Sequence, residues 1–200
     1  MEKLKKRIVI GISGASGFVY AEHLLKALQV LPIETHLVMS KAAQITRQQE
    51  TGIPLAELKK WVSVYHPIED IGASIASGSF QHHGMVVVPC SMKTLAEIAI
   101  GLSNNLLTRA ADVTLKEKRP LIIVPRETPL HAVHLKNMVT IAELGGVIAP
   151  PMPAFYQHPK SIEEMVQHFT GRLLSLLQID QELTPEWQGW RPIKHNPSDL

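Results

Sequence analysis

Hydroxyl side chains follow successive apolar runs of this chain, in positions where they could bind a phosphate group. They belong to Ser13, Ser16, Ser40 and Ser91, and Thr94 lies three residues after the last of these. Each serine taken alone is more often a helix N-cap, since serine is a preferred residue there. Four of them at successive strand ends favour a phosphate site instead, because the N–H groups that open a helix also bind anions.

The first turn, "GISGASG" at residues 11–17, resembles a dinucleotide-binding turn in which serines replace two of the three glycines. An NAD-binding domain also places an acidic residue at the end of its second strand to hold a ribose hydroxyl. This chain has Ser40 and Lys41 there. A hydroxyl followed by a cation suits a phosphate better than a ribose diol, so the pattern favours a mononucleotide such as FMN over NAD.

Charged residues near other strand ends are candidates for catalysis. Arg126 and Glu127 follow the apolar run at 121–124, where the forked donors of arginine could clamp a phosphate. A solvated salt bridge between these two residues is the alternative. Glu50 and Glu127 are candidate acids, although each alone is more often a surface carboxylate. By default we expect Lys116 to be a solvated lysine at a helix end.

The histidines and the single cysteine give weak evidence for chemistry. His131 and His134 are spaced to share one face of a helix, but no cysteine or acidic cluster accompanies them. We therefore expect capping or surface histidines and no metal site. Cys90 is expected to be a buried thiol at a strand end. One cysteine allows no internal disulfide, which favours a cytoplasmic location.

A parallel sheet would bring these strand ends together. The apolar runs are nearly continuous and alternate with helical patterns, which is typical of parallel strands buried on both faces. We predict one doubly wound α/β domain with three layers and about five or six strands. The strands are expected at residues 8–10, 36–39, 85–88, 121–124 and 147–149. The domain would cover residues 1–200, with a basic tail over about 1–7, a capping box at 161–164 that opens the last helix, and an irregular tail over about 184–200.

The composition argues against several classes of protein. Apolar residues make up 45% of the chain and charged residues 19%, as in a globular domain. The net charge of +2 comes from a short N-terminal cluster, and no basic stripe with interleaved aromatic residues is present, so no nucleic acid partner is expected. No apolar run is long enough to cross a membrane, and we see no signal-peptide pattern.

Several segments together are similar to those of the UbiX-like flavin prenyltransferases. They are "GISGASG", "ETHLVMSKAA", "VVPCSMKTLA", "LLTRAADVTLKEKRPLIIVPRETPLHAVHLKNM" and "PPMPAFYQHP". The likeness extends from about Ile8 to Trp187, which is nearly the whole chain. The stretch Thr108–Met138 is the specific part of the resemblance, since "GISGASG" alone would not distinguish this family.

The resemblance implies a flavodoxin-like, doubly wound sheet that binds FMN. Members of the family join a dimethylallyl group, taken from dimethylallyl monophosphate, to N5 and C6 of reduced FMN without a metal. A UbiD-type decarboxylase then uses the prenylated FMN on aromatic or α,β-unsaturated acids, in ubiquinone synthesis or in aromatic-acid breakdown. The resemblance also implies a homododecamer in which adjacent subunits build each site.

The resemblance also assigns roles to individual residues, and all of these positions carry the residue that the family has. FMN would be held by Gly14, Ala15, Ser16, Ser40, Ser91, Met92, Lys93, Thr94 and Arg126. The prenyl phosphate would be held by Lys116, Arg126, Tyr156 and Arg172. The reacting centre, with its proton handling, would be lined by Ser16, Glu50 and Glu127. The cations among these residues would stabilise the departing phosphate by electrostatic preorganisation.

One position departs from the family pattern, and two other functions stay open. Some members have a tryptophan ahead of the "ASGS" segment, where this chain has Ile71, so that the flavin, Trp187 or Trp190 would shelter the allylic cation. An FMN-dependent cysteine-type decarboxylase would share the fold, but its "PAMN"-like segment corresponds here to residues 150–153, which lack an asparagine. A non-catalytic FMN carrier or decarboxylase accessory subunit would leave the bound flavin unchanged.

Overall fold

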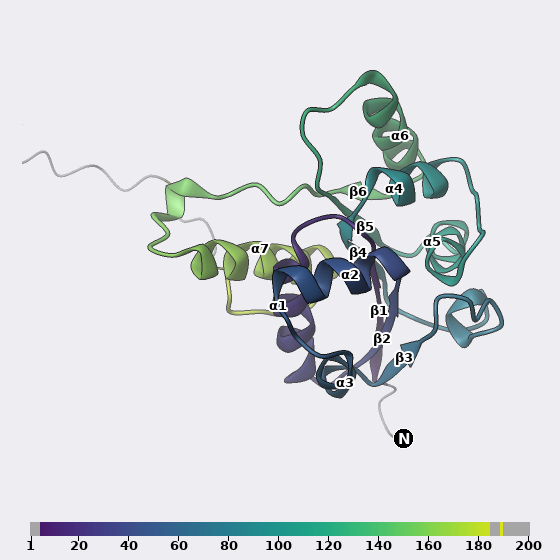
Figure 1. Cartoon of the computed structure of the whole chain (residues 1–200), viewed down its shortest axis with the longest axis horizontal. Helices are drawn as coiled ribbons and strands as arrows, with labels where there is room; N and C mark the ends of the chain where they lie inside the picture. The colour runs from purple at the N-terminus through teal and green to yellow at the C-terminus, as the bar shows by residue number, and fades with distance from the viewer. Residues whose placement is uncertain (1–4, 185–188, 190–200) are drawn as a thin grey trace, which may run out of the picture.

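The computed structural model describes residues 5–184 and residue 189 (Figure 1). Its centre is a sheet of six strands, all paired in parallel, in the order β3-β2-β1-β4-β5-β6. The strands are β1 (Lys6–Ile12), β2 (Ile33–Met39), β3 (Val64–His66), β4 (Met85–Cys90), β5 (Leu121–Pro125) and β6 (Val147–Ile148). The predicted doubly wound sheet is confirmed, and its strand order is that of Rossmann-type domains. The sequence did not predict β3, which has only three residues.

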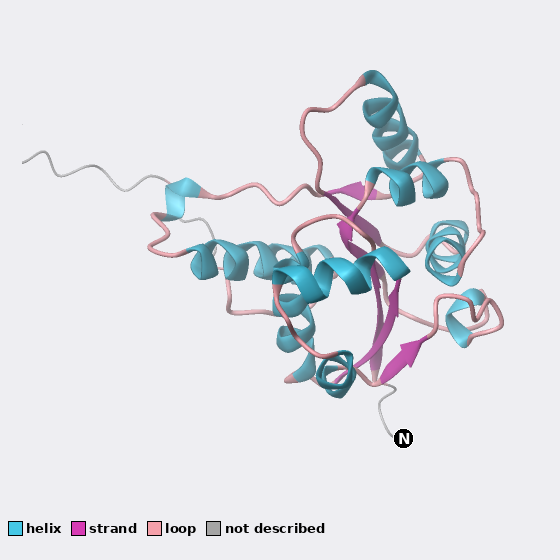
Figure 2. Cartoon of the chain, in the orientation of Figure 1, coloured by secondary structure: helices cyan, strands magenta, loops and turns pink. Residues whose placement is uncertain are grey.

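Helices cover both faces of the sheet and give the molecule three layers (Figure 2). The α-helices are α1 (Phe18–Gln29), α2 (Lys41–Glu50), α3 (Leu55–Leu58), α4 (Met92–Ala99), α5 (Leu106–Lys116), α6 (Ala132–Glu143) and α7 (Ile162–Leu176). Short 3-10 helices are η1 (Lys59–Trp61), η2 (Ser74–Ala76) and η3 (Phe155–Gln157). On one face α1 and α7 pack side by side, and on the other α4 packs against α5 and α6 (Figure 1).

Alternation along the strands builds a separate apolar core on each face. Ile8 and Ile10 of β1 pack in the core that contains α1 and α7, whereas Val9 packs in the core that contains α4, α5 and α6. All three side chains are completely buried. This two-sided burial explains why the strands are nearly continuous apolar runs.

The direction in which strands are added reverses between β1 and β4. From β1 the chain adds β2 and then β3 on one side, and it returns to place β4 on the other side of β1. The loops that follow β1 and β4 therefore diverge at the carboxyl ends of these two strands. Ligands of open α/β sheets bind in the crevice at such a point.

A hydrogen-bonded chain, here called the amino-edge network, starts at the amino ends of β1 and β2 and reaches the last residue of β3: Arg7, Glu34, His36 and His66. The two histidines are buried, and Arg7 and Glu34 are partly exposed. Arg7 Nε donates to Glu34 Oε2 at 3.2 Å. Glu34 Oε1 lies 2.8 Å from His36 Nε2, and His36 Nδ1 lies 2.9 Å from His66 Nε2. Because the carboxylate only accepts, His36 carries its proton on Nε2 and accepts at Nδ1 from His66. Each member thus has a partner from a neighbouring position of β1, β2 or β3.

The last helix begins with a modified capping box. Ser161 Oγ accepts a hydrogen bond from the backbone N–H of Glu164 at 3.1 Å, as predicted. The Glu164 carboxylate accepts from the backbone N–H of Lys160 at 2.7 Å, one residue before the N-cap.

Among the residues described, no helix combines the length and the apolar character that crossing a membrane requires. Most of the predicted tail after Thr184, with Trp187 and Trp190, lies outside the described residues.

Candidate functional site

A cavity of about 830 Å³ opens at the carboxyl edge of the sheet, beyond the ends of β1, β2, β3 and β4. This volume lies within the usual range for small-molecule and cofactor sites. Its lining residues are Gly14, Ser40, Lys41, Ala42, Ile68, Glu69, Ile71, Ser91, Lys93, Thr94, Glu97, Asn104, Asn105 and Leu107. The cavity therefore contains five of the predicted cofactor-binding residues: Gly14, Ser40, Ser91, Lys93 and Thr94.

Gly14 brings the first turn into contact with the start of α2. A Cβ atom at Gly14 would lie 2.3 Å from the Cβ of Ala42, which is too close for any side chain. Ser40, the N-cap of α2, is also tied to this turn because its backbone N–H donates to Ile12 O at 2.9 Å. The N-terminus of α2 is thereby held against the turn at one side of the cavity.

The two serines that line the cavity are helix N-caps. Ser40 Oγ accepts from the N–H of Ala43 at 3.1 Å, and Ser91 Oγ accepts from the N–H of Thr94 at 3.3 Å. Ser91 Oγ also donates to Thr94 Oγ1 at 3.2 Å. The capping interpretation is thus correct for Ser40 and Ser91, and both caps open a helix whose first N–H groups lie beside the cavity.

Ser13 is not a cap, and its hydroxyl joins two loops. Its Oγ donates to Pro89 O at 3.1 Å and accepts from the backbone N–H of Ser91 at 2.7 Å. The side chain is buried, so neither bond competes with water. Ser13 fixes the loop after β1 to the end of β4, across the crevice between the two strands.

The start of α1 is capped by a residue from another helix. Its N-cap, Gly17, has φ of 106° and offers no side chain, and Ser16 does not cap the helix either. Instead the Glu50 carboxylate accepts from the N–H of Gly17 at 3.0 Å and from the N–H of Phe18 at 2.8 Å. An anionic side chain is favourable at a helix N-terminus. Glu50 thus lies within hydrogen-bond reach of the residues that follow Ser16.

Arg126 reaches this same turn from the end of β5. Its Nε donates to Ser16 O at 3.3 Å, and its backbone N–H donates to Cys90 O at 3.2 Å. Among the described residues no ion pair joins Arg126 to Glu127, so the alternative of a salt bridge between them is wrong. Glu127 Oε1 instead accepts from the N–H of Thr128 at 3.0 Å. Ser16, Glu50 and Arg126 gather at the start of α1, next to the cavity.

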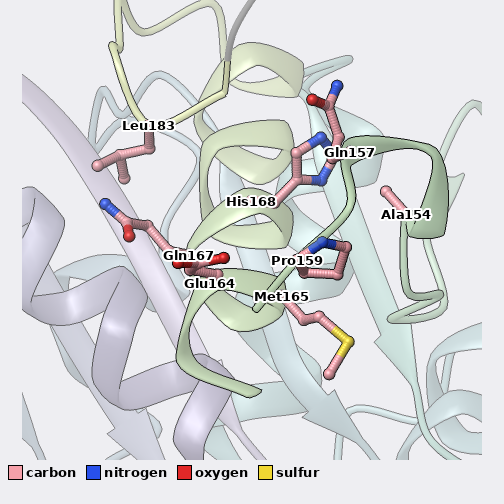
Figure 3. A pocket seen from close by; sticks show the side chains of 8 residues that line it. All are labelled: Ala154, Gln157, Pro159, Glu164, Met165, Gln167, His168 and Leu183. Carbon is pink, nitrogen blue, oxygen red and sulfur yellow. The ribbon is translucent and has the colours of Figure 1, made fainter. Parts of the chain in front are cut away.

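Tyr156 and Arg172 belong to a second group, on the arm that runs from β6 through η3 to α7. Tyr156 lies edge-on to His168, with ring centroids 6.2 Å apart. Burial, and then the charge of Arg172 one turn further along α7, lower the pKa of His168. His168 also lines a pocket of about 180 Å³ in which its ring faces the segment that carries Gln157 (Figure 3). A Tyr20–Phe169 ring contact, with centroids 5.4 Å apart, holds α7 against the first turn of α1.

Lys116 lies at the other end of α5 from the cavity. It is the last residue of α5, whose N-cap Asn105 lines the cavity, and its Nζ pairs with the Glu117 carboxylate. An α-helix rises about 1.5 Å per residue, so the length of α5 separates this ammonium from the cavity of its own chain by roughly 15 Å.

The lining of the cavity matches the predicted cofactor-binding residues only in part. Ala15, Ser16, Met92 and Arg126 do not line the cavity, whereas Ile68, Glu69, Glu97, Asn104 and Asn105 do. Sequence reasoning missed Glu97, although its spacing from Ser91 and Thr94 on α4 could have indicated it. Within the described part of the chain, no cluster of three His, Cys, Asp or Glu side chains could hold a metal ion.

His131, His134 and Cys90 lie outside the cavity, and they are the capping or surface histidines and the buried thiol that the sequence predicts. His131 caps α6 by accepting the N–H of Val133 at 3.2 Å, and its ring stacks on His134 with centroids 3.5 Å apart. Cys90 is completely buried at the end of β4, and this burial raises the pKa of its thiol. A thiol held protonated in this way is a poor nucleophile.

The cavity suits FMN by its chemistry and by its size. Two helix N-termini, at Ser40 and Ser91, offer N–H groups to a phosphate, and Gly14 allows close approach of backbone. Ile68, Ile71 and Leu107 provide an apolar surface for a flat ring system. The residues present therefore fit a flavin mononucleotide.

Comparisons with known proteins agree with this chemistry. The model of the flavoprotein family matches residues 1–173. A flavin prenyltransferase UbiX of Neisseria meningitidis serogroup B is 50% identical over 184 residues, which cover 92% of this chain and 97% of that protein. The crystal structure of AnUbiX (PadA1) in complex with FMN and dimethylallyl pyrophosphate has 45% identity and a TM-score of 0.91, covering 94% of this chain and 100% of that one.

A further solved structure is a dodecameric FMN-dependent UbiX-like decarboxylase from Escherichia coli O157:H7. It has 43% identity and a TM-score of 0.89, and the match covers 92% of this chain and 100% of that one. Identity at this level over nearly the whole length of both chains goes well beyond a shared fold. The chain therefore belongs to the flavoprotein family and, within it, to the UbiX-like flavin prenyltransferases.

Proposed function

We propose that this protein is a metal-independent flavin prenyltransferase that transfers a dimethylallyl group from dimethylallyl monophosphate to N5 and C6 of reduced FMN. The observation that carries the proposal is the cavity at the carboxyl edge of the sheet, with two capped helix N-termini inside it and Ser16, Glu50 and Arg126 beside it. Similarity to curated flavin prenyltransferases supports the choice of reaction.

The bound flavin supplies the nucleophilic atoms, and the protein positions them. The N–H groups at the start of α2 or at the start of α4 would hold the flavin phosphate, with Ser40 and Ser91 fixing the two helix ends. Ile71, a residue of the cavity lining that is 65% exposed, is an aliphatic surface where an aromatic residue would stand in other members. It can exclude water from an allylic cation but provides no π-face.

The guanidinium of Arg126 would stabilise the departing phosphate. It is held by Ser16 O through Nε, which leaves its terminal N–H groups available as forked donors. Tyr156 and Arg172 would contact the same phosphate from the α7 arm. Such preorganised charges stabilise a developing anion without a cost of reorganisation at the moment of reaction.

Glu50 and Glu127 would handle protons at the reacting centre. The Glu50 carboxylate already accepts two backbone N–H groups, so its geometry is fixed by the start of α1. Glu127 is exposed and bonded only to the N–H of Thr128 in the described residues, so it is the more accessible of the two. We assign Glu127 the exchange of protons with solvent and Glu50 the transfer of protons at the Ser16 turn, which Glu50 also orients.

Lys116 would act in the site of a neighbouring subunit. The distance along α5 removes it from its own cavity, and exposed apolar side chains offer surfaces for association with other copies. They include Ile100, Leu102, Val133, Leu135, Val139, Met152, Phe155 and Ile162. We therefore propose a homo-oligomer, with the dodecamer as the expected form. Its product would pass to a UbiD-type decarboxylase in the cytoplasm.

The test is to incubate the protein with reduced FMN and dimethylallyl monophosphate without added metal. The expected product is a flavin about one isoprene unit heavier, detected by mass spectrometry. Dimethylallyl diphosphate in a parallel reaction identifies the preferred donor. Recovery of unmodified FMN from both reactions would leave only an FMN carrier, and release of carbon dioxide from a peptidyl-cysteine would indicate the decarboxylase instead.

A further inference from the structure

Glu97 is a buried acidic residue in the flavin cavity that the proposed function does not use. It lies on α4, and its side chain is 10% exposed. It lines the cavity together with Ser91 and Thr94 of the same helix start and with Asn104 and Asn105 of the next one. A carboxylate is seldom buried without a partner, because removing its charge from water is costly.

The neighbours of Glu97 satisfy one of its two oxygens. Oε1 accepts from Asn104 Nδ2 at 3.3 Å and lies 3.5 Å from Lys93 Nζ. The described residues give Oε2 no hydrogen-bond partner, and Oε2 is not among their fully buried polar atoms that lack one. Since an ionised carboxylate can accept about four hydrogen bonds, Oε2 keeps its capacity and is open to the cavity.

The cavity therefore has two chemically different ends. On the side of β1 and β2 it presents the start of α2 with Ser40 and the backbone of Gly14, whose N–H groups suit an anion, and Lys41 there is paired with Glu69 at 2.9 Å. On the side of α4 and α5 it presents the Glu97 carboxylate, which repels an anion and accepts from O–H or N–H donors. FMN has one phosphate, and its ribityl hydroxyls and its ring N3–H are donors.

We propose that Glu97 binds the flavin directly, with Oε2 accepting a hydrogen bond from a ribityl hydroxyl or from N3–H, and that it sets the direction of the flavin in the cavity. The phosphate then points toward Ser40 and the start of α2. This inference rests on the proposal that the cavity holds FMN, but it does not depend on the prenyl transfer itself.

The experiment measures the dissociation constants of FMN and riboflavin by fluorescence titration of the flavin-free full-length protein. Glu97→Ala should weaken both flavins by the same factor, about 10-fold to 100-fold, as expected for the loss of a hydrogen bond to a charged group. Glu97→Gln, which keeps an acceptor and the side-chain volume, should weaken both by about 3-fold to 10-fold. Ser40→Ala should weaken FMN alone, because riboflavin has no phosphate.

The matched control is Glu57→Ala. Glu57 also pairs with a nearby lysine, Lys60 at 2.8 Å, but it does not line the cavity. FMN with a methyl group on N3 separates the two donors. If N3–H is the donor, Glu97→Ala should bind this methylated FMN as tightly as the parent protein does. If a ribityl hydroxyl is the donor, Glu97→Ala should weaken the methylated FMN by the same factor as FMN.

Three results would overturn the proposal. Flavin binding by Glu97→Gln and Glu97→Ala within 2-fold of the parent protein shows that Oε2 does not contact the flavin. A loss in Glu97→Ala confined to FMN contradicts the proposed direction. Failure of the parent protein to bind FMN removes both this inference and the proposed function. FMN binding without prenylated product overturns only the proposed reaction.

Discussion

The two edges of the sheet carry similar residue types in opposite states. In the amino-edge network, each of Arg7, Glu34, His36 and His66 bonds the next, with both histidines buried and Arg7 and Glu34 partly exposed. At the carboxyl edge, Arg126, Glu127 and Ser16 are exposed; Arg126 donates to the backbone oxygen of Ser16, and Glu127 accepts from the backbone N–H of Thr128. A polar group with satisfied partners stabilises the fold, whereas one with unused capacity can bind a ligand.

Titration separates the two edges further. Burial lowers the pKa of His36, with the hydrogen bond from His36 to Glu34 opposing the shift, and burial and then the charge of His36 lower the pKa of His66. Nearby His82 donates to Gly84 O, and burial together with the charge of Arg119 lowers its pKa to about 4. The amino edge therefore favours neutral histidines, while the carboxyl edge is arranged for an anion.

The largest expected effect is on catalysis, from Lys116→Ala. If Lys116 serves the site of a neighbouring subunit, kcat/KM for dimethylallyl monophosphate should fall about 10²- to 10³-fold, as for loss of a preorganised donor. The dissociation constant for FMN should stay within 3-fold. Co-expression with Arg126→Ala should restore part of the activity, since mixed oligomers contain some intact sites. No recovery in verified mixed oligomers would place Lys116 in its own subunit's site or in none.

The next effect is on folding, from His36→Ala at the amino edge. Removing His36 leaves His66 without its partner and Glu34 with Arg7 alone, and it empties the volume of a buried ring, which together should cost about 4 kcal/mol of unfolding free energy. Urea denaturation measures this loss. His23→Ala, a half-buried histidine of α1, is the matched control, with an expected cost below about 1 kcal/mol. We expect kcat per folded protein to stay unchanged in His36→Ala. A large loss of kcat would contradict the purely structural role that we give to the amino edge.

A pH series tests the same edge without a substitution. The pKa of His82 is about 4 in the folded protein and 6.5 as the ordinary value, so the unfolded chain binds more protons between these pH values. Stability should be complete above pH 6.5 and should fall by about 3 kcal/mol as the pH decreases to 4. In His82→Gln the urea midpoint should change less over this range. An equal slope in both proteins would assign the pH dependence to other groups.

The smallest expected effect is from Ser13→Ala, which probes the carboxyl edge as a structural element. The backbone N–H of Ser91 loses a buried acceptor, and we expect a cost of about 2 kcal/mol in unfolding free energy. FMN binding should weaken as well, because α4 then starts from a looser position. Ser13→Cys keeps a weak acceptor and should be intermediate. Full stability in Ser13→Ala would mean that water replaces the hydroxyl.

The fold was largely predictable, because burial on both faces produces long apolar runs that are visible in the sequence. β3 was missed because two of its three residues are polar or aromatic and its role is to hold His66 against His36. The site was predictable in type but not in detail. That Ser40 and Ser91 follow strands is visible in the sequence, whereas the loop partner of Ser13 is 76 residues away. The places of Glu97 in the cavity and of Lys116 outside it could not be predicted, because they depend on the directions in which α4 and α5 run from the sheet.

The Ser13 hydroxyl also has a consequence for engineering. Because it donates to Pro89 and accepts from Ser91, the loops after β1 and β4 behave as one rigid piece. A graft that exchanges the "GISGASG" segment for that of another flavin enzyme will keep its geometry only if residues 89–91 are exchanged with it. The segment that must be transferred is thus discontinuous in the gene. Libraries that vary residues 11–17 or residues 89–91 alone will mostly contain variants in which the two loops no longer fit together.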